Sequence, residues 1–149
     1  MMVRQNKEIL LVEDNPDDVE LTRIAFAEAG SEHVIRVMSD GAQAVDYLFA
    51  RGDFADRDGS ELPALVLLDL NLPKLNGREV LQAIREDPAT RALPVVVLTT
   101  SAEPMDVGGV YDLGANSYIQ KPVEFERFVE VVRQIGLYWL VLNQPPTQA

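Results

Sequence analysis

The sequence contains no cysteine and a single histidine, His33. The lack of cysteine excludes disulfides, thiolate metal sites and thiol nucleophiles, and one histidine cannot anchor a multi-histidine metal site. No apolar run reaches the roughly 20 residues of a transmembrane helix, and no signal peptide is visible in the polar residues 1–7. These absences predict a cytoplasmic protein that does not cross a membrane.

Basic residues are scarce as well. The chain has 13 lysines and arginines against 24 aspartates and glutamates, which gives a net charge of −11. Such a chain repels phosphate backbones and anionic lipid headgroups. We therefore expect it to bind neither nucleic acid nor membrane surfaces, and we expect a cation or a basic protein surface as its partner.

Short apolar runs alternate with segments of helical periodicity along the 149 residues, which is the length of one domain. Runs that are apolar on both faces are typical of buried parallel strands. We predict strands at residues 9–12, 33–38, 65–68, 94–98 and 118–119, helices that begin near residues 15, 41, 76, 104 and 124, and a polar loop at 52–62. The predicted fold is an α/β, doubly wound, five-stranded parallel sheet with helices on both faces.

Polar residues follow four of these strands. They are Glu13 and Asp14, Asp69, Thr99 and Thr100, and Lys121. The carboxyl ends of parallel strands meet at one edge of a sheet, so these side chains are expected to gather there. Clustered carboxylates need a cation, and an all-oxygen set suits Mg²⁺. A lysine and a threonine beside them suit a phosphoryl group.

Each of these residues also has an ordinary structural interpretation. Asp14 could cap a helix together with Asn15 and Pro16, and Asp69 could simply end a strand. The two threonines are common in strands. Only the joint order, with one polar group at each of these strand ends, favours a functional site.

In this combination the chain resembles the receiver domain of two-component response regulators over about residues 7–135. The resemblance is carried by Glu13–Asp14, by Asp69–Leu70–Asn71–Leu72–Pro73 with Asn76–Gly77, by Thr99, and by Lys121–Pro122. It implies the (βα)5 flavodoxin-like receiver fold. Residues 1–6 would then form an N-terminal tail and residues 136–149 a C-terminal extension.

The resemblance also implies a role for each matching residue. Asp69 would be the phosphoacceptor, in a protein that takes part in its own phosphorylation and dephosphorylation but is not a turnover enzyme. Mg²⁺ would be held by Glu13, Asp14, Asp69 and the backbone carbonyl of Asn71. The phosphoryl oxygens would contact Lys121 and Thr99, with help from the Thr100 amide. Tyr118 would be the switch aromatic, and the Lys121–Pro122 bond would be cis.

Further features resemble the small phytochrome-associated response regulators. They are the run Glu13–Asp14–Asn15–Pro16–Asp17–Asp18, the long loop before the third strand, Leu98–Thr99–Thr100–Ser101, Tyr138–Trp139–Leu140 and Pro145–Pro146. This resemblance implies a sensor histidine kinase as partner, specifically a bacteriophytochrome. Without a DNA-binding output domain, the signal would pass through protein contacts.

The last helix carries two apolar stripes. One contains Phe125, Phe128, Val129, Val132, Ile135 and Trp139, and the other contains Val131, Tyr138 and Leu142. One stripe can cover the sheet, and the second predicts a homodimer through the last helix and the extension. The alternative is that residues 137–142 fold back and complete the core of a monomer.

Two other classes of protein place an aspartate or a ligand at similar points of such a sheet. A hydrolase of the haloacid dehalogenase class forms a phosphoaspartate after its first strand and needs a second acid two residues later, where this chain has Asn71. A flavodoxin-like cofactor-binding domain needs a hydroxyl- and glycine-rich phosphate loop after the first strand, where this chain has Glu13 and Asp14. Both are disfavoured.

Two adjacent glycines, Gly108 and Gly109, fall inside the predicted fourth helix. Each costs a helix about 1 kcal/mol relative to alanine, so the helix could shift during a switch. The alternative is that the glycines permit a close contact between the helix and the sheet.

Overall fold

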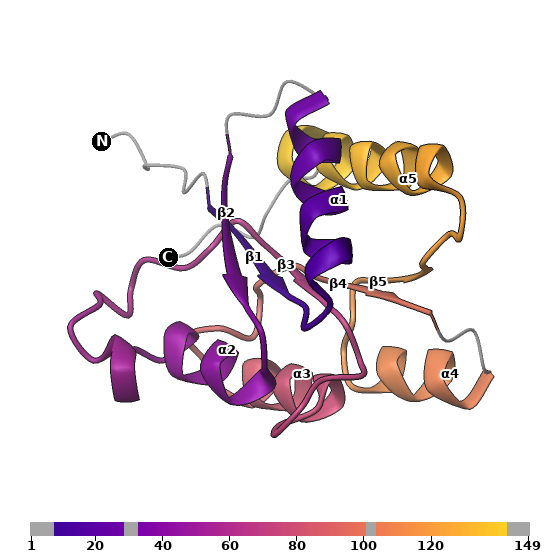
Figure 1. The fold of residues 1–149 in the computed structure, drawn as a ribbon. Helices are drawn as coiled ribbons and strands as arrows, with labels where there is room; N and C mark the ends of the chain where they lie inside the picture. The colour runs from indigo at the N-terminus through magenta and orange to yellow at the C-terminus, as the bar shows by residue number, and fades with distance from the viewer. Residues whose placement is uncertain (1–7, 29–32, 101–103, 143–149) are drawn as a thin grey trace.

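Figure 1 shows the computed structural model, which describes residues 8–28, 33–100 and 104–142. The predicted tail 1–6, Ser101 and Pro145–Pro146 lie outside these ranges. Five parallel strands form one sheet in the order β2-β1-β3-β4-β5. The strands are β1 (Glu8–Val12), β2 (Val34–Met38), β3 (Leu65–Leu68), β4 (Val95–Thr99) and β5 (Ser117–Gln120).

A helix follows each strand, as the alternating pattern predicts. The helices are α1 (Pro16–Glu28), α2 (Gly41–Leu48), α3 (Gly77–Glu86), α4 (Pro104–Asp112) and α5 (Phe125–Leu137). The predicted loop contains a short 3-10 helix, η1 (Gly52–Phe54), and α5 continues into a π-helix, η2 (Tyr138–Leu142). No helix in the described ranges combines the length and hydrophobicity that a transmembrane span requires.

Helices cover both faces of the sheet, which confirms the predicted fold. In Figure 1, α1 and α5 lie on one face, and α2, α3 and α4 lie on the other. Because side chains alternate along a strand, each strand supplies both cores. Leu10 and Leu68 join the core beneath α2 and α3, whereas Ile9 and Leu67 join the core beneath α1 and α5.

The strand order places a topological switch point between β1 and β3. The chain leaves β1 towards α1 on one face and leaves β3 towards α3 on the other, so their carboxyl ends open between two helices. Ligand sites of open parallel sheets form at such a point. Glu13 and Asp69 directly follow these two strands.

The start of α3 is fitted closely against the end of β3. Asn76 caps the helix, with its side-chain oxygen accepting from the Glu79 amide at 3.0 Å while Glu79 bonds back to the Asn76 amide. A Cβ at Gly77 would lie only 2.4 Å from the carbonyl oxygen of Asp69. Glycine at this position therefore lets the helix approach the backbone of Asp69.

The segment formed by α5 and η2 combines features of both predicted alternatives. Three residues of α5 are buried in the core between this helix and the sheet, namely Phe128, Val132 and Ile135. Trp139 and Leu140 pack against the same core as partly buried residues. Leu137 and Tyr138, by contrast, remain 54% and 51% exposed. The segment thus folds onto the core with some side chains and presents others to solvent.

The two glycines of α4 make no close contact. An added Cβ at Gly108 or Gly109 would meet nothing within 4 Å. The alternative of a helix–sheet contact that requires glycine is therefore wrong. The two glycines therefore lower the helix propensity of α4 without allowing closer packing against a neighbouring element.

Alanine substitutions at Gly77 and Gly108 should have opposite effects on stability. Gly77→Ala should lower the free energy of unfolding by about 1–3 kcal/mol, because the methyl group clashes with backbone. Gly108→Ala should leave it unchanged or raise it by up to about 1 kcal/mol, because the methyl group enters open space. Urea unfolding measures both, and equal effects would contradict the close approach at Gly77.

Candidate functional site

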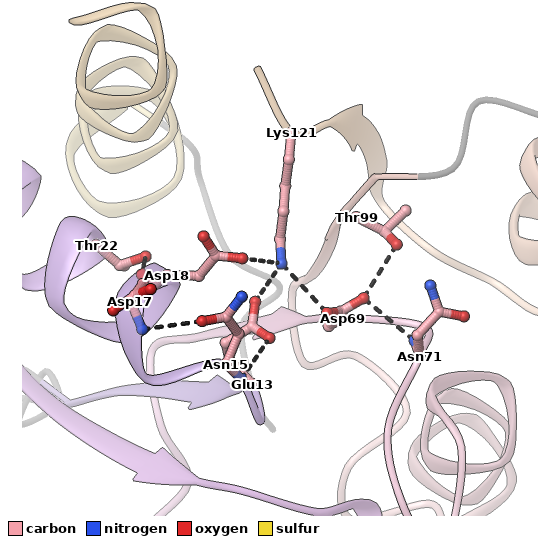
Figure 2. Close-up of polar contacts among 9 residues, drawn as sticks. All are labelled: Glu13, Asn15, Asp17, Asp18, Thr22, Asp69, Asn71, Thr99 and Lys121. Atoms are coloured by element: carbon pink, nitrogen blue, oxygen red, sulfur yellow. Dashed lines mark hydrogen bonds and ion pairs between the residues drawn. The ribbon is translucent and has the colours of Figure 1, made fainter. Parts of the chain in front are cut away.

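The polar residues predicted at the strand ends lie together in the structure (Figure 2). Glu13 follows β1, Asp69 follows β3, Thr99 ends β4 and Lys121 follows β5. All four side chains are buried. Every buried side-chain nitrogen and oxygen in the described ranges has a hydrogen-bond partner, so the cluster is fully satisfied.

The ammonium group of Lys121 lies at the centre of the cluster. It donates to Glu13 Oε1, to Asp18 Oδ2 at 2.8 Å and to Asp69 Oδ2 at 3.2 Å. The backbone supports this position, because the Lys121 amide donates to the Thr99 carbonyl oxygen at 2.6 Å. Lys121 therefore joins the end of β5 to the end of β1, the start of α1 and the end of β3.

Asp69 is held through both of its carboxylate oxygens. Oδ2 faces Lys121, and Oδ1 accepts from Thr99 Oγ1 at 3.0 Å and from the Asn71 amide at 3.2 Å. Figure 2 shows Lys121 on one side of the carboxylate and Thr99 with Asn71 on the other. The carboxylate has a fixed orientation and lies next to a cation and a hydroxyl.

Negative charge is in excess at this site. Burial alone would lower the pKa of Lys121, but ion pairs with Asp18, Glu13 and Asp69 outweigh it, so the pKa is raised and the amine is charged. Burial raises the pKa of Glu13 to about 7, although Lys121 opposes the shift. One ammonium group does not compensate all the surrounding carboxylates, and a further cation would.

Three carboxylates at this edge of the sheet could hold a metal ion, namely those of Glu13, Asp14 and Asp69. One oxygen from each of Glu13, Asp14 and Asp69 lies within 4.8 Å of the others. Asp14 is exposed, and the first turn of α1 is capped by Asn15, whose Oδ1 accepts from the Asp17 amide at 2.9 Å. Asp14 is therefore free of the capping role that Asn15 fulfils. The all-oxygen set fits Mg²⁺ or a similar hard cation.

The remaining predicted residues are placed less centrally. Thr100 is exposed, and its carbonyl oxygen accepts from Gln120 Nε2 at 3.3 Å. Asn71 contributes its backbone amide to Asp69. Tyr118 is partly buried against the core beneath α2 and α3, and its amide donates to the Tyr111 hydroxyl at 3.1 Å.

The prediction of a cis Lys121–Pro122 bond is wrong for this structure. No peptide bond in the described ranges is cis. The trans form of a bond to proline is favoured by about 0.5–1 kcal/mol, so cis geometry arises only where the surroundings impose it.

Sequence reasoning missed one residue of the cluster, Asp18. Its carboxylate contacts Lys121 from the first turn of α1. The only available signal was the pair of acids, Asp17 and Asp18, after Pro16. The helical period separates these two side chains by about 100°. Without the orientation of the helix, the sequence does not show which of them faces the site.

Comparison with known proteins decides the family. The model of the response regulator receiver domain matches residues 9–133. The chain belongs to this family. The finding agrees with the receiver interpretation and not with the hydrolase or the flavodoxin-like domain.

Two relatives cover most of the chain. The probable methanogenesis regulatory protein FilR2 of Methanothrix harundinacea is 43% identical over 95% of this chain and 88% of its own length. Response regulator Rcp1 of Synechocystis sp. is 39% identical over 90% of this chain and 89% of its own length. The name of FilR2 refers to the regulation of methanogenesis, whereas that of Rcp1 states only that it is a response regulator.

Solved structures agree with this assignment. The phosphorylated cyanobacterial phytochrome response regulator RcpA has a TM-score of 0.88 and 40% identity, covering 96% of this chain and all of its own. The Mn²⁺-bound form of Rcp1 has a TM-score of 0.86 and 36% identity, covering 94% and 99%. The bacteriophytochrome response regulator RtBRR has a TM-score of 0.76 and 49% identity, covering 95% and 85%.

Mg²⁺ should stabilise the folded protein through the three carboxylates. A cation that binds only the folded state stabilises it by about 2.7 kcal/mol at a free concentration of 100 times Kd. Urea unfolding with and without MgCl₂ measures this difference. Asp14→Asn should lose most of it, whereas Asp53→Asn, at an exposed acid of η1, should keep it. Equal stabilisation of both variants would contradict the site.

Proposed function

We propose that this receiver accepts a phosphoryl group from a sensor histidine kinase onto Asp69. The observation that carries the proposal is the fixed carboxylate of Asp69, with Lys121 on one oxygen and Thr99 on the other. This arrangement places a positive charge and a hydroxyl donor where the oxygens of a transferred phosphoryl group would carry their charge.

In the proposed step, an Asp69 carboxylate oxygen attacks the phosphorus of a kinase phosphohistidine. A phosphorus–oxygen bond forms, the phosphorus–nitrogen bond breaks, and the imidazole nitrogen leaves with its electron pair. The product is an acyl phosphate. Lys121 stabilises the negative charge on the phosphoryl oxygens while the phosphoryl group is transferred, and the Thr99 hydroxyl donates a hydrogen bond to one of these oxygens. Hydrolysis of the acyl phosphate by water returns Asp69 to its carboxylate.

Glu13, Asp14 and Asp69 would hold Mg²⁺, with the backbone carbonyl of Asn71 as a further oxygen ligand. The excess of carboxylates and the all-oxygen donor set support this assignment. The ion would neutralise charge between the carboxylate and the phosphoryl group, which otherwise repel each other.

Phosphorylation would change the contacts of Thr99 and Lys121. Both now bond to the Asp69 carboxylate. After transfer, the phosphoryl oxygens become their strongest acceptors, so both side chains would move towards them. Tyr118 lies on the adjacent strand and would follow the space that Thr99 leaves. The Thr100 amide would add a further donor to the phosphoryl group.

The kinase that we propose is a phytochrome, and specifically a bacteriophytochrome. The likeness to Rcp1, RcpA and RtBRR supports this pairing, and the pair would act in the cytoplasm. The likeness to FilR2 points to a different signal. Phosphotransfer from a purified bacteriophytochrome, compared with an unrelated sensor kinase, distinguishes the two.

We also propose a homodimer through α5 and the extension at residues 136–149. Leu137 and Tyr138 support it, because two large side chains lie exposed at the end of a helix whose other face is buried. Exposed apolar patches of this kind are typical of protein contacts. A second copy would meet the same residues across a two-fold axis.

A small phosphodonor such as acetyl phosphate with Mg²⁺ should phosphorylate the protein. Mass spectrometry should detect one added phosphoryl group on the wild type. Asp69→Asn should remain unmodified, because an amide is a poor nucleophile and forms no acyl phosphate. Asp53→Asn, which removes the same charge outside the cluster, should be modified like the wild type. Modification of Asp69→Asn to the same extent would contradict the assignment.

Truncation after Gly136 should convert the protein from a dimer to a monomer. Sedimentation velocity of the full chain and the truncated chain measures this difference. Leu137→Asp in the full chain should weaken the dimer in the same way, because it places a charge in the contact. A monomer for the full chain at all concentrations would exclude the dimer.

A further inference from the structure

Asp18 contacts the site without belonging to the group of carboxylates that could hold a metal ion. That group comprises Glu13, Asp14 and Asp69. The carboxylate of Asp18 instead makes a 2.8 Å ion pair with Lys121 from the first turn of α1. In Figure 2 it approaches the amine from the side opposite to Asp69.

The three carboxylates around Lys121 use its whole donor capacity. An ammonium group has three N–H donors, and here they face Glu13, Asp18 and Asp69. No donor remains for a phosphoryl oxygen. Lys121 must therefore release one carboxylate before it can contact a transferred group.

The three partners differ in how readily they can be released. The side chains of Glu13 and Asp69 are 4% and 9% exposed, whereas that of Asp18 is 22% exposed. A buried carboxylate that loses its counter-ion has a large desolvation penalty, while a carboxylate at the surface is solvated by water. The contact with Asp69 would pass to the phosphoryl group that this residue carries, and of the two other partners Asp18 can be released at the lower cost.

We propose that Asp18 is a positioning residue that competes with the phosphoryl group for Lys121. In the unphosphorylated protein it holds the amine towards α1, and it releases the amine when a tetrahedral anion occupies Asp69. This inference rests on the proposed function, because it assumes that Lys121 contacts the phosphoryl group. Asp18 would thus set how strongly the site binds that group.

Binding of beryllium fluoride, a tetrahedral mimic of the phosphoryl group, tests the proposal. Isothermal titration calorimetry at saturating MgCl₂ gives its Kd. Asp18→Asn should tighten binding about two- to fivefold, the range expected when a partly exposed ion pair no longer competes. Asp18→Glu, which keeps the charge, should return binding to the wild-type level.

Asp17→Asn is the matched control. It removes one negative charge from the same turn of α1, but the side chain is exposed and the ion pair of Lys121 is made by Asp18. Its Kd should remain that of the wild type. If Asp18→Asn binds no tighter than the wild type, or if Asp17→Asn tightens binding equally, the proposal is wrong.

A second measurement does not depend on the proposed function. Without Mg²⁺ or beryllium fluoride, Asp18→Asn should lower Tm by about 1–4 °C relative to Asp17→Asn, because it loses the contact with Lys121. If Asp18→Asn does not fold, Asp18→Ser replaces it, and the same tighter binding of beryllium fluoride and the same lower Tm are expected. Equal Tm values for the two variants would overturn the proposal. A wild type that binds no beryllium fluoride while this Tm difference holds would instead contradict the proposed function.

Discussion

The site depends on one buried ammonium group shared among several carboxylates. Lys121 joins Glu13, Asp18 and Asp69, which are 108, 103 and 52 positions away along the chain. A buried carboxylate without a counter-ion is costly, so the acidic ends of β1 and β3 require the lysine. The lysine completes their hydrogen bonds but does not neutralise all of their charge, and this residual negative charge is what makes the site suitable for a cation.

The topology brings these groups together without a long loop. The carboxyl ends of β1 and β3 meet at the switch point of the sheet, and β4 and β5 extend the same edge. Close packing then fixes the orientation of the carboxylate. Gly77 lets α3 lie against the backbone of Asp69, and the Asn71 amide in the intervening turn bonds to its side chain. Stability of the fold and orientation of the site therefore depend on the same contacts.

The fold and most of the site could be predicted from the sequence because both follow from local patterns. Apolar runs mark the strands, and residues directly after a strand must lie at its carboxyl edge whatever the helices do. Asp18 could not be predicted in this way, because its contact depends on how α1 is rotated about its axis. The two apolar stripes of α5 show a second limit. The first stripe correctly places Trp139 on the core and leaves Tyr138 outside it, but its Phe125 is 47% exposed, whereas Val131 of the second stripe packs on the core. The apolar character of a side chain does not by itself show how much of the helix face its neighbours cover.

Helix α1 contacts Lys121 through Asp18, and α5 packs on the same helix. Asp18 lies in the first turn of α1, and Phe26 near its last turn contacts α5 so closely that a Cβ at Gly136 would lie 3.0 Å from its ring. Leu137 and Tyr138 follow directly after Gly136. A change in the contact between Asp18 and Lys121 therefore acts on a helix that touches the proposed dimer surface at its other end. Close-packed interiors have low compressibility and transmit strain, and a packing contact between a ring and a glycine backbone leaves little space to absorb it. The proposed phosphorylation site and the proposed dimer surface are thus joined by a single helix, without the need for a longer path through the sheet.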